Sequence, residues 1–132
     1  MDGPRLDQDD VDSIMGRFRR AYGAADAEGL TAILTDDFEW HMHYGESGSD
    51  SPGGRVRKGV TGMVEELRWR RENWTDVQYE DLAERPAGDL VLQTFTTKGI
   101  DPTGREFHVN VVDLYRVRDG RICHKDTYWK QL

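Results

Sequence analysis

Hydrophobic residues near the start of the chain recur at the spacing of an α-helix. Between residues 11 and 25 they follow one another by one or three positions, which places them on one face. This spacing predicts a helix with a buried apolar side, and Asp26 is a suitable cap for a second, shorter helix. The residues expected on the two buried faces are Val11, Ile14, Met15, Phe18, Ala21, Tyr22 and Ala25, then Leu30, Ile33 and Leu34.

Further along, the pattern changes to the period of two that is typical of strands. In residues 37–44 the apolar side chains alternate with polar ones, which predicts a strand. Residues 45–55 are rich in Gly and Ser and read as a loop, and a third helix is expected from about Gly59. Four more strands are expected at 75–84, 90–99, 105–117 and 121–130, joined by turns.

This order of elements predicts the class of fold. Helices near the beginning and hairpins near the end are typical of an α+β protein with a curved, mostly antiparallel sheet. We expect a loose tail at residues 1–8 and a single domain at 9–132, in keeping with the length of 132 residues. A curved sheet around three helices leaves a conical space, which is a common place for a small-molecule pocket.

Composition narrows the possible partners. The net charge is −7, so the chain lacks the basic surface that nucleic-acid binding needs, and we expect no nucleic-acid partner. No apolar run approaches the ~20 residues of a membrane span, and the acidic start does not resemble a signal peptide. Cys123 is the single cysteine, which excludes a disulfide within the chain and is consistent with the cytoplasm, where we expect the protein.

Basic residues gather in two short clusters. The first contains Arg55, Arg57 and Lys58, and the second contains Arg68, Arg70 and Arg71. We expect both on solvated faces. The alternative is that the first cluster guides an anionic substrate.

Several segments of this sequence resemble the NTF2-like superfamily. They are YGAADAEGL at 22–30, LTDDFEWH at 34–41, RKG at 57–59, VDLYRVRDGRI at 112–122 and YW at 128–129. Their order and spacing are most similar to the SnoaL-like polyketide cyclases, the ketosteroid isomerases and the limonene-epoxide hydrolases. The resemblance implies a cystatin-like cone, with three N-terminal helices packed on the sheet. It also implies a homodimer formed through the outer face of that sheet.

The resemblance implies that one of the three polar residues of the isomerases, an aspartate, is kept in this chain as Asp113. The ketosteroid isomerases place a tyrosine, a proton-abstracting aspartate and a protonated aspartate at positions that match Phe18, Met42 and Asp113. The epoxide hydrolases place an aspartate on the last strand, where this chain has Thr127. Asp126 is one residue away and would face the other side unless a bulge shifts the register. These departures argue against both chemistries in their standard form.

Asp113 is therefore the main candidate for chemistry. It interrupts an apolar stretch, and a carboxyl group in apolar surroundings resists ionisation and can donate a hydrogen bond or a proton. The alternative is a structural carboxylate that pairs with Lys125 or Arg116 across the hairpin.

Three further residues are candidates for the second proton step. Lys125 shares a strand face with Thr127, so its amine can stabilise an enolate or bind a carboxylate, or it forms an ion pair with Asp113. Tyr22 lies four residues after Phe18, on the same face of the helix. It either supplies the hydroxyl that the isomerases have at the position of Phe18, or belongs to the core. His43 lies beside the Gly- and Ser-rich loop and is a general base only if a bulge turns it inward.

We also expect aromatic residues to form the cavity wall and the histidines to lie outside it. An aromatic wall favours a small apolar ligand, although such residues are also common in cores. The residues predicted to bind substrate are Phe18, Trp40, Met42, Tyr44, Tyr115, Thr127 and Trp129. His41 and His43 share a face and resemble a metal pair, but a metal needs more converging ligands, so we expect no metal and place both at the dimer interface.

The chain is thus predicted to be a small-molecule enzyme that needs no cofactor. Its expected chemistry is acid/base catalysis on an apolar substrate that carries a carbonyl or hydroxyl group, such as isomerisation, cyclisation, dehydration or epoxide opening. The alternative is a ligand-binding or dimeric assembly module of the same fold without catalysis.

Overall fold

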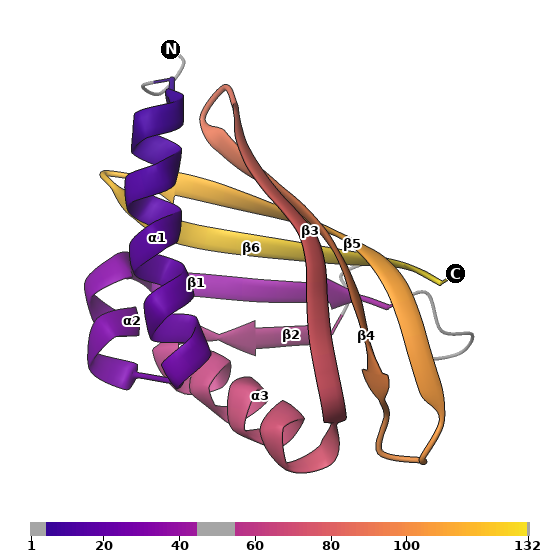
Figure 1. Ribbon diagram of the computed structural model, residues 1–132. Helices are drawn as coiled ribbons and strands as arrows, with labels where there is room; N and C mark the ends of the chain where they lie inside the picture. Colours follow the sequence, from indigo (N-terminus) through magenta and orange to yellow (C-terminus); the bar gives the residue numbers. More distant parts are fainter. Residues whose placement is uncertain (1–4, 45–54, 132) are drawn as a thin grey trace.

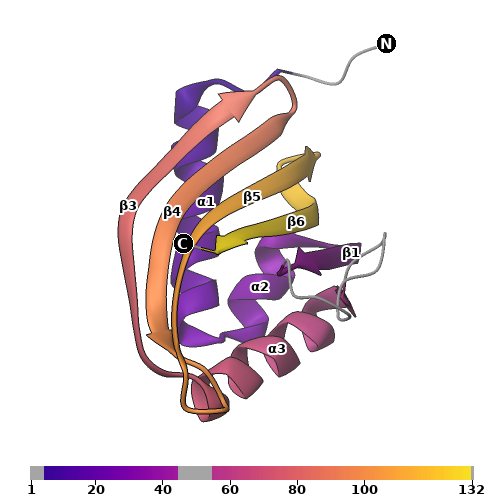
Figure 2. The same cartoon turned by 90° about the vertical axis from the view of Figure 1, so that its right-hand side faces the viewer.

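A curved sheet with helices on its concave face forms the molecule (Figures 1 and 2). The computed structural model describes residues 5–44 and 55–131, and within them it has three helices and six strands. The helices are α1 (Gln8–Ala24), α2 (Ala27–Ile33) and α3 (Gly59–Asn73). The strands are β1 (Leu34–His43), β2 (Arg55–Lys58), β3 (Thr75–Ala87), β4 (Leu90–Ile100), β5 (Glu106–Arg118) and β6 (Arg121–Gln131).

The strand order in the sheet is β2-β1-β6-β5-β4-β3. All pairs are antiparallel except β1 with β6, which run parallel. Figure 2 shows the long strands β3 and β4 bending around the helices. The predicted α+β fold with a mostly antiparallel sheet is therefore confirmed.

The first helix begins and ends as its sequence favours. The side chain of Asp7 accepts a hydrogen bond from the backbone N–H of Asp10, whose carboxylate accepts one from Asp7 in return, so the two form a capping box. At the other end, Ala25 adopts a left-handed conformation with φ 49° and closes the helix. The predicted apolar face of α1 is buried from Val11 to Ala21.

Two local predictions differ from the structure. Residue 55, predicted to belong to the loop, and residues 56–58, for which no element was predicted, form the edge strand β2, which pairs with β1 from Glu39 to Met42. Three of its four side chains are charged and all but one are exposed, so it lacks the alternation of buried and exposed side chains that identifies a strand. Leu34, predicted on the second helix, is the first residue of β1. The rest of the predicted loop, 45–54, lies outside the described residues.

The core fills the space between the helices and the concave face of the sheet. It combines the buried side of α1 with inward residues of α2, α3, β1 and β5. None of the described helices has both the length and the apolar character needed to cross a membrane.

Candidate functional site

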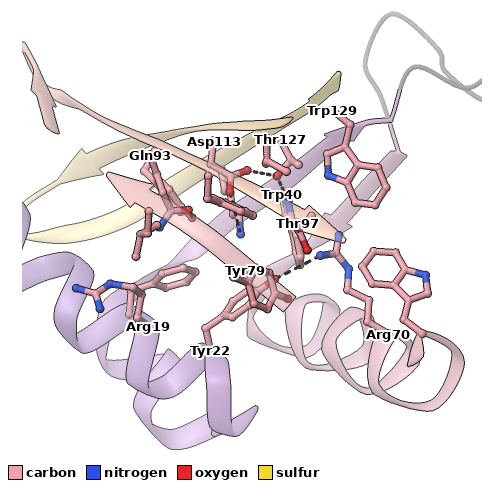
Figure 3. A pocket seen from close by; sticks show the side chains of 17 residues that line it. Arg19, Tyr22, Trp40, Arg70, Tyr79, Gln93, Thr97, Asp113, Thr127 and Trp129 are labelled. Carbon is pink, nitrogen blue, oxygen red and sulfur yellow. Dashed lines mark hydrogen bonds and ion pairs between the residues drawn. The ribbon is translucent and has the colours of Figure 1, made fainter. Parts of the chain in front are cut away.

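A cavity of about 260 Å³ opens between α1, α3 and the concave face of the sheet (Figure 3). Aromatic rings from every side form most of its wall. Eight of the residues predicted to form the site line it: Phe18, Tyr22, Trp40, Asp113, Tyr115, Lys125, Thr127 and Trp129. Strand alternation places six of them on inward positions of β1, β5 and β6, and helical periodicity places Phe18 and Tyr22 on the inner face of α1.

Asp113 is held in a short chain of buried hydrogen bonds. The indole Nε1 of Trp40 donates to Thr127 Oγ1 at 2.8 Å, and that hydroxyl donates to Asp113 Oδ1 at 2.5 Å. Asp113 and Thr127 face each other directly across β5 and β6. Because Thr127 accepts from Trp40, its own proton is directed at the carboxylate. These two hydrogen bonds therefore fix one oxygen of Asp113 as an acceptor.

The second oxygen of Asp113 faces Lys125. The Nζ atom lies 4.0 Å from Asp113 Oδ2, and both side chains are almost fully buried. Lys125 is also placed against Trp40 and Tyr115, its neighbours on the adjoining strands. The pKa of Lys125 falls to about 8, mainly because burial disfavours the charged amine. The attraction of Asp113 opposes this fall, and the nearby charge of Arg70 adds to it.

Four aromatic rings surround the same amine. Its Nζ lies 4.3 Å from the ring centre of Trp40 and 4.5 Å from that of Tyr22. The rings of Phe18 and Tyr115 follow at 5.4 Å each. Such contacts stabilise a cation in a place with little water.

The cavity tyrosines are protonated at neutral pH. Burial raises the pKa of the Tyr22 hydroxyl, and it raises that of Tyr115 well above its ordinary value. Tyr115 donates a hydrogen bond of 2.7 Å to Gln93, whose amide donates in turn to Glu84. Tyr22 accepts a long hydrogen bond from Arg70 at 3.4 Å.

Arg70 is the main residue of the site that sequence analysis missed. Its guanidinium lies 4.8 Å from the ring centre of Trp40 and 4.6 Å from that of Trp74. It also donates to Tyr44 Oη at 2.7 Å. The solvated face predicted for Arg70 is wrong, because its side chain is only 13% exposed. The spacing Glu66 to Arg70, four residues apart on a helix, was the available signal.

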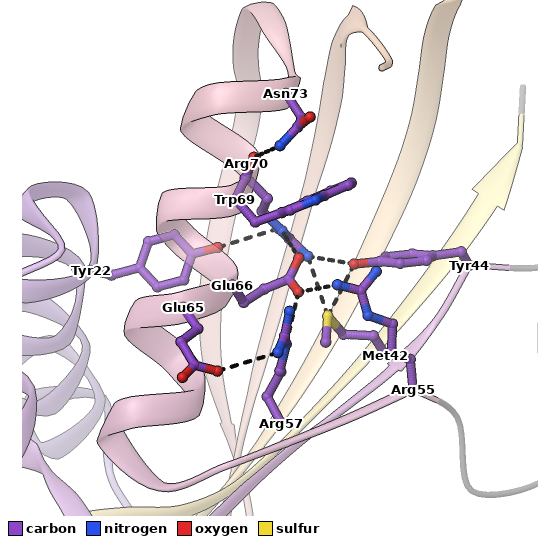
Figure 4. Close-up of polar contacts among 10 residues, drawn as sticks. All are labelled: Tyr22, Met42, Tyr44, Arg55, Arg57, Glu65, Glu66, Trp69, Arg70 and Asn73. Atoms are coloured by element: carbon purple, nitrogen blue, oxygen red, sulfur yellow. Dashed lines mark hydrogen bonds and ion pairs between the residues drawn. The ribbon is translucent and has the colours of Figure 1, made fainter. Parts of the chain in front are cut away.

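Glu66 explains why a cation can be buried there (Figure 4). Its side chain is fully buried and accepts hydrogen bonds from Arg55 at 2.5 Å, Arg57 at 3.3 Å and Arg70 at 2.9 Å. Burial alone would lower the pKa of Arg70, but the charge of Glu66 and the hydrogen bond that it accepts from Arg70 raise it. The first predicted basic cluster thus serves in part to hold this carboxylate at the edge of β2.

Three predicted site residues lie outside the cavity. Met42 is fully buried in the core, where its sulfur accepts hydrogen bonds from Arg70 and Tyr44. Tyr44 lines a neighbouring hollow at the mouth of the cone. His43 lies on the outer face and stacks on Tyr128 at 4.8 Å, because β1 pairs with β6 without a break from residue 39 to 43.

The outer face also holds His41, the other member of the pair that resembled a metal site in the sequence. His41 stacks on His124 at 4.6 Å, and each ring hydrogen bonds to a carboxylate, Glu39 or Asp126 respectively. The residue that approaches His41 is therefore His124 rather than His43. Asp126 belongs to this face and Thr127 to the cavity, so no bulge exchanges the two.

Further lining residues come from β3, β4 and β5 and from the position that directly follows α3, where the sequence offered no signal beyond apolar periodicity. They include Trp74, Tyr79, Leu82, Gln93, Phe95, Thr97 and Val111.

The fold and the cavity together define a cone-shaped α+β protein with an internal, mainly aromatic chamber. Residues 15–125 match the family model of the SnoaL-like domain, and the chain belongs to this family. The predicted place in the SnoaL-like branch of the NTF2-like superfamily is thereby confirmed. No curated protein matches the sequence closely enough to count as a relative.

Solved structures share the fold at low sequence identity. An NTF2-like protein from Burkholderia xenovorans has a TM-score of 0.79 and 22% identity, covering 96% of this chain and 92% of that one. A putative polyketide cyclase from Xanthomonas campestris has a TM-score of 0.70 and 16% identity, covering 93% and 92%. IdmH, a putative polyketide cyclase from Streptomyces antibioticus, has a TM-score of 0.63 and 23% identity, covering 89% and 90%.

Proposed function

We propose that this protein is a cytoplasmic small-molecule enzyme that performs acid/base chemistry on an apolar substrate with a carbonyl or hydroxyl group. One observation carries the proposal: the carboxylate of Asp113 and the amine of Lys125 stand 4.0 Å apart on the wall of a largely apolar cavity. An apolar chamber with a few convergent polar groups is the usual form of a small-molecule site.

The two groups have complementary roles in such a reaction. Asp113, aligned by Thr127, takes a proton from a carbon or oxygen of the substrate and returns it at another position. Protonated Lys125 stabilises the negative charge that develops on the substrate oxygen. The surrounding rings exclude water, which strengthens both effects. These roles suit isomerisation, cyclisation, dehydration or epoxide opening, and they need no cofactor.

The test uses 2-tetralone, a small apolar ketone with acidic α-hydrogens. Exchange of those hydrogens with solvent deuterium is followed by NMR for the wild type and for Asp113→Asn. The variant is expected to lose roughly 100-fold in rate while it retains its fold and its affinity for the ketone. Asp126→Asn is the matched control, because it alters a neighbouring carboxylate on the outer face. Equal rates for wild type and Asp113→Asn would contradict the proposal.

A non-catalytic binding module is the second candidate. It is favoured by the fact that every buried side-chain nitrogen and oxygen of residues 5–44 and 55–131 has a hydrogen-bond partner. A binder would take up the ketone with similar affinity in wild type and Asp113→Asn, and neither would accelerate exchange.

We further propose that the protein forms a homodimer through the outer face of the sheet. Val112 and Tyr128 face each other across β5 and β6 on this side, and both are large apolar residues exposed to solvent. The stacked ring of His43 extends the same patch. A second copy that covers this patch would remove apolar surface from water.

A further inference from the structure

The environment of Lys125 differs from that of every other lysine in the chain. Lys58, Lys98 and Lys130 are exposed, whereas Lys125 is 3% exposed and lines the cavity. Its amine is enclosed by aromatic rings and has Asp113 beside it. A lysine that is desolvated in an apolar pocket, near another cation, is the typical setting of a nucleophilic amine.

The charged groups around this amine favour easy loss of its proton. Arg70 on α3 contacts the same Trp40 ring as Lys125 and repels its positive charge, while Glu66 on α3 and Asp113 on β5 attract it. Burial outweighs that attraction, so the pKa of Lys125 falls to about 8. Tyr22 on α1 and Tyr115 on β5 also face the amine, and both stay neutral because their pKa values are raised.

We propose that Lys125 forms a Schiff base with the carbonyl carbon of an aldehyde or ketone substrate. This inference rests on the proposed function and names its substrate class. It also gives Lys125 a covalent role, in place of a purely electrostatic one.

The step balances within the Lys125–Asp113 pair. The ammonium passes a proton to the Asp113 carboxylate, and the neutral Nζ forms a bond to the carbonyl carbon while the C=O π pair moves to oxygen. A proton then shifts from nitrogen to that oxygen, which gives a neutral carbinolamine. The C–O bond breaks, the oxygen leaves as water with the proton held by Asp113, and the nitrogen lone pair forms the C=N bond. The products are an iminium ion, the Asp113 carboxylate and one water molecule.

The iminium ion suits the cavity for two reasons. It carries the same positive charge as the ammonium it replaces, so the rings that stabilise the one stabilise the other. It also withdraws electrons from the adjoining carbon, whose hydrogen becomes acidic. The regenerated Asp113 carboxylate lies beside the nitrogen and can accept that proton, which links the covalent step to the acid/base chemistry.

Reductive trapping tests the proposal on the unaltered protein. The protein is incubated at pH 7 with benzaldehyde and sodium cyanoborohydride, which reduces an iminium ion to a stable secondary amine. Peptide mapping by mass spectrometry then locates the benzyl group. From the pKa of about 8 against the ordinary value of 10.5, the neutral fraction of Lys125 at pH 7 exceeds that of an ordinary lysine by roughly 300-fold. We therefore expect labelling at Lys125 before the three exposed lysines, rising with pH and levelling above pH 8.

Labelling spread over Lys58, Lys98 and Lys130 with Lys125 unmodified would overturn the proposal. Lys125→Arg keeps the positive charge but cannot form the adduct. Lys130→Met is the matched control, in which Lys125 can still form the adduct. The ketone exchange assay distinguishes failure of the Schiff-base proposal from failure of the proposed acid/base function. If the wild type exchanges 2-tetralone and Lys125→Arg does so equally well, the Schiff base is refuted and the acid/base function stands.

Discussion

Replacing Lys125 with methionine is expected to change how the free energy of unfolding depends on pH. The pKa of this amine falls from 10.5 to about 8 in the folded protein. At about 1.36 kcal/mol for each pKa unit, the buried charge costs roughly 3 kcal/mol of stability. This is an appreciable part of the stability of a domain, which is about 5–15 kcal/mol.

The sign follows from the protons bound in each state. Between pH 8 and 10.5 the unfolded chain holds a proton on Lys125 that the folded protein has lost, so stability rises with pH in this window. The destabilisation is complete below pH 8 and disappears above pH 10.5. From pH 7 to pH 10, the wild type is thus expected to gain roughly 2 kcal/mol relative to Lys125→Met.

Urea unfolding, followed by tryptophan fluorescence at a series of pH values, measures this difference. Lys130→Met serves as the control, because it makes the same replacement at an exposed position of the same strand. If the stability curves of wild type and Lys125→Met run parallel from pH 7 to pH 10, then the amine is not desolvated and the reasoning about the site is refuted.

Three further predictions concern other parts of the structure. Thr127→Val leaves the buried indole N–H of Trp40 without its acceptor and should lower the free energy of unfolding by about 1–3 kcal/mol, whereas Thr127→Ser keeps the acceptor and the stability. Equal urea midpoints for the wild type and Thr127→Val would contradict this prediction. Glu66→Gln leaves three guanidinium groups without their carboxylate and should lower the free energy of unfolding by about 3–5 kcal/mol. The same replacement at the exposed Glu65 should lower it by less than about 0.5 kcal/mol. Tyr128→Glu should convert the proposed dimer into a monomer in sedimentation analysis, and an unchanged mass would exclude this face as the interface.

Regular periodicity is what made much of the fold predictable. The apolar spacing of α1 and the alternation of β5 and β6 are local patterns that survive in the structure, so Asp113, Lys125 and Thr127 could be placed on one face from the sequence. Asp113 was identified because a carboxylate interrupts an apolar stretch, and this contrast is visible without coordinates.

The features that were missed depend on long side chains and on short strands. Arg70 follows several charged residues on α3, and its position resembles a solvated face until the buried Glu66 and the rings of Trp40 and Trp74 are known. The edge strand β2 is four charged or exposed residues long, and only its pairing with β1 identifies it. The stack of His41 on His124 joins residues 83 positions apart, which no local pattern can indicate.

A double-mutant cycle on ketone exchange tests most directly whether Asp113 and Lys125 act together in the cavity. Deuterium exchange into 2-tetralone is measured for wild type, Asp113→Asn, Lys125→Met and the double variant. Each single replacement is expected to remove most of the acceleration, and the double variant is expected to be hardly slower than either, because the two groups serve one step. Losses that multiply independently, or a wild type that does not exceed the rate without protein, would contradict it.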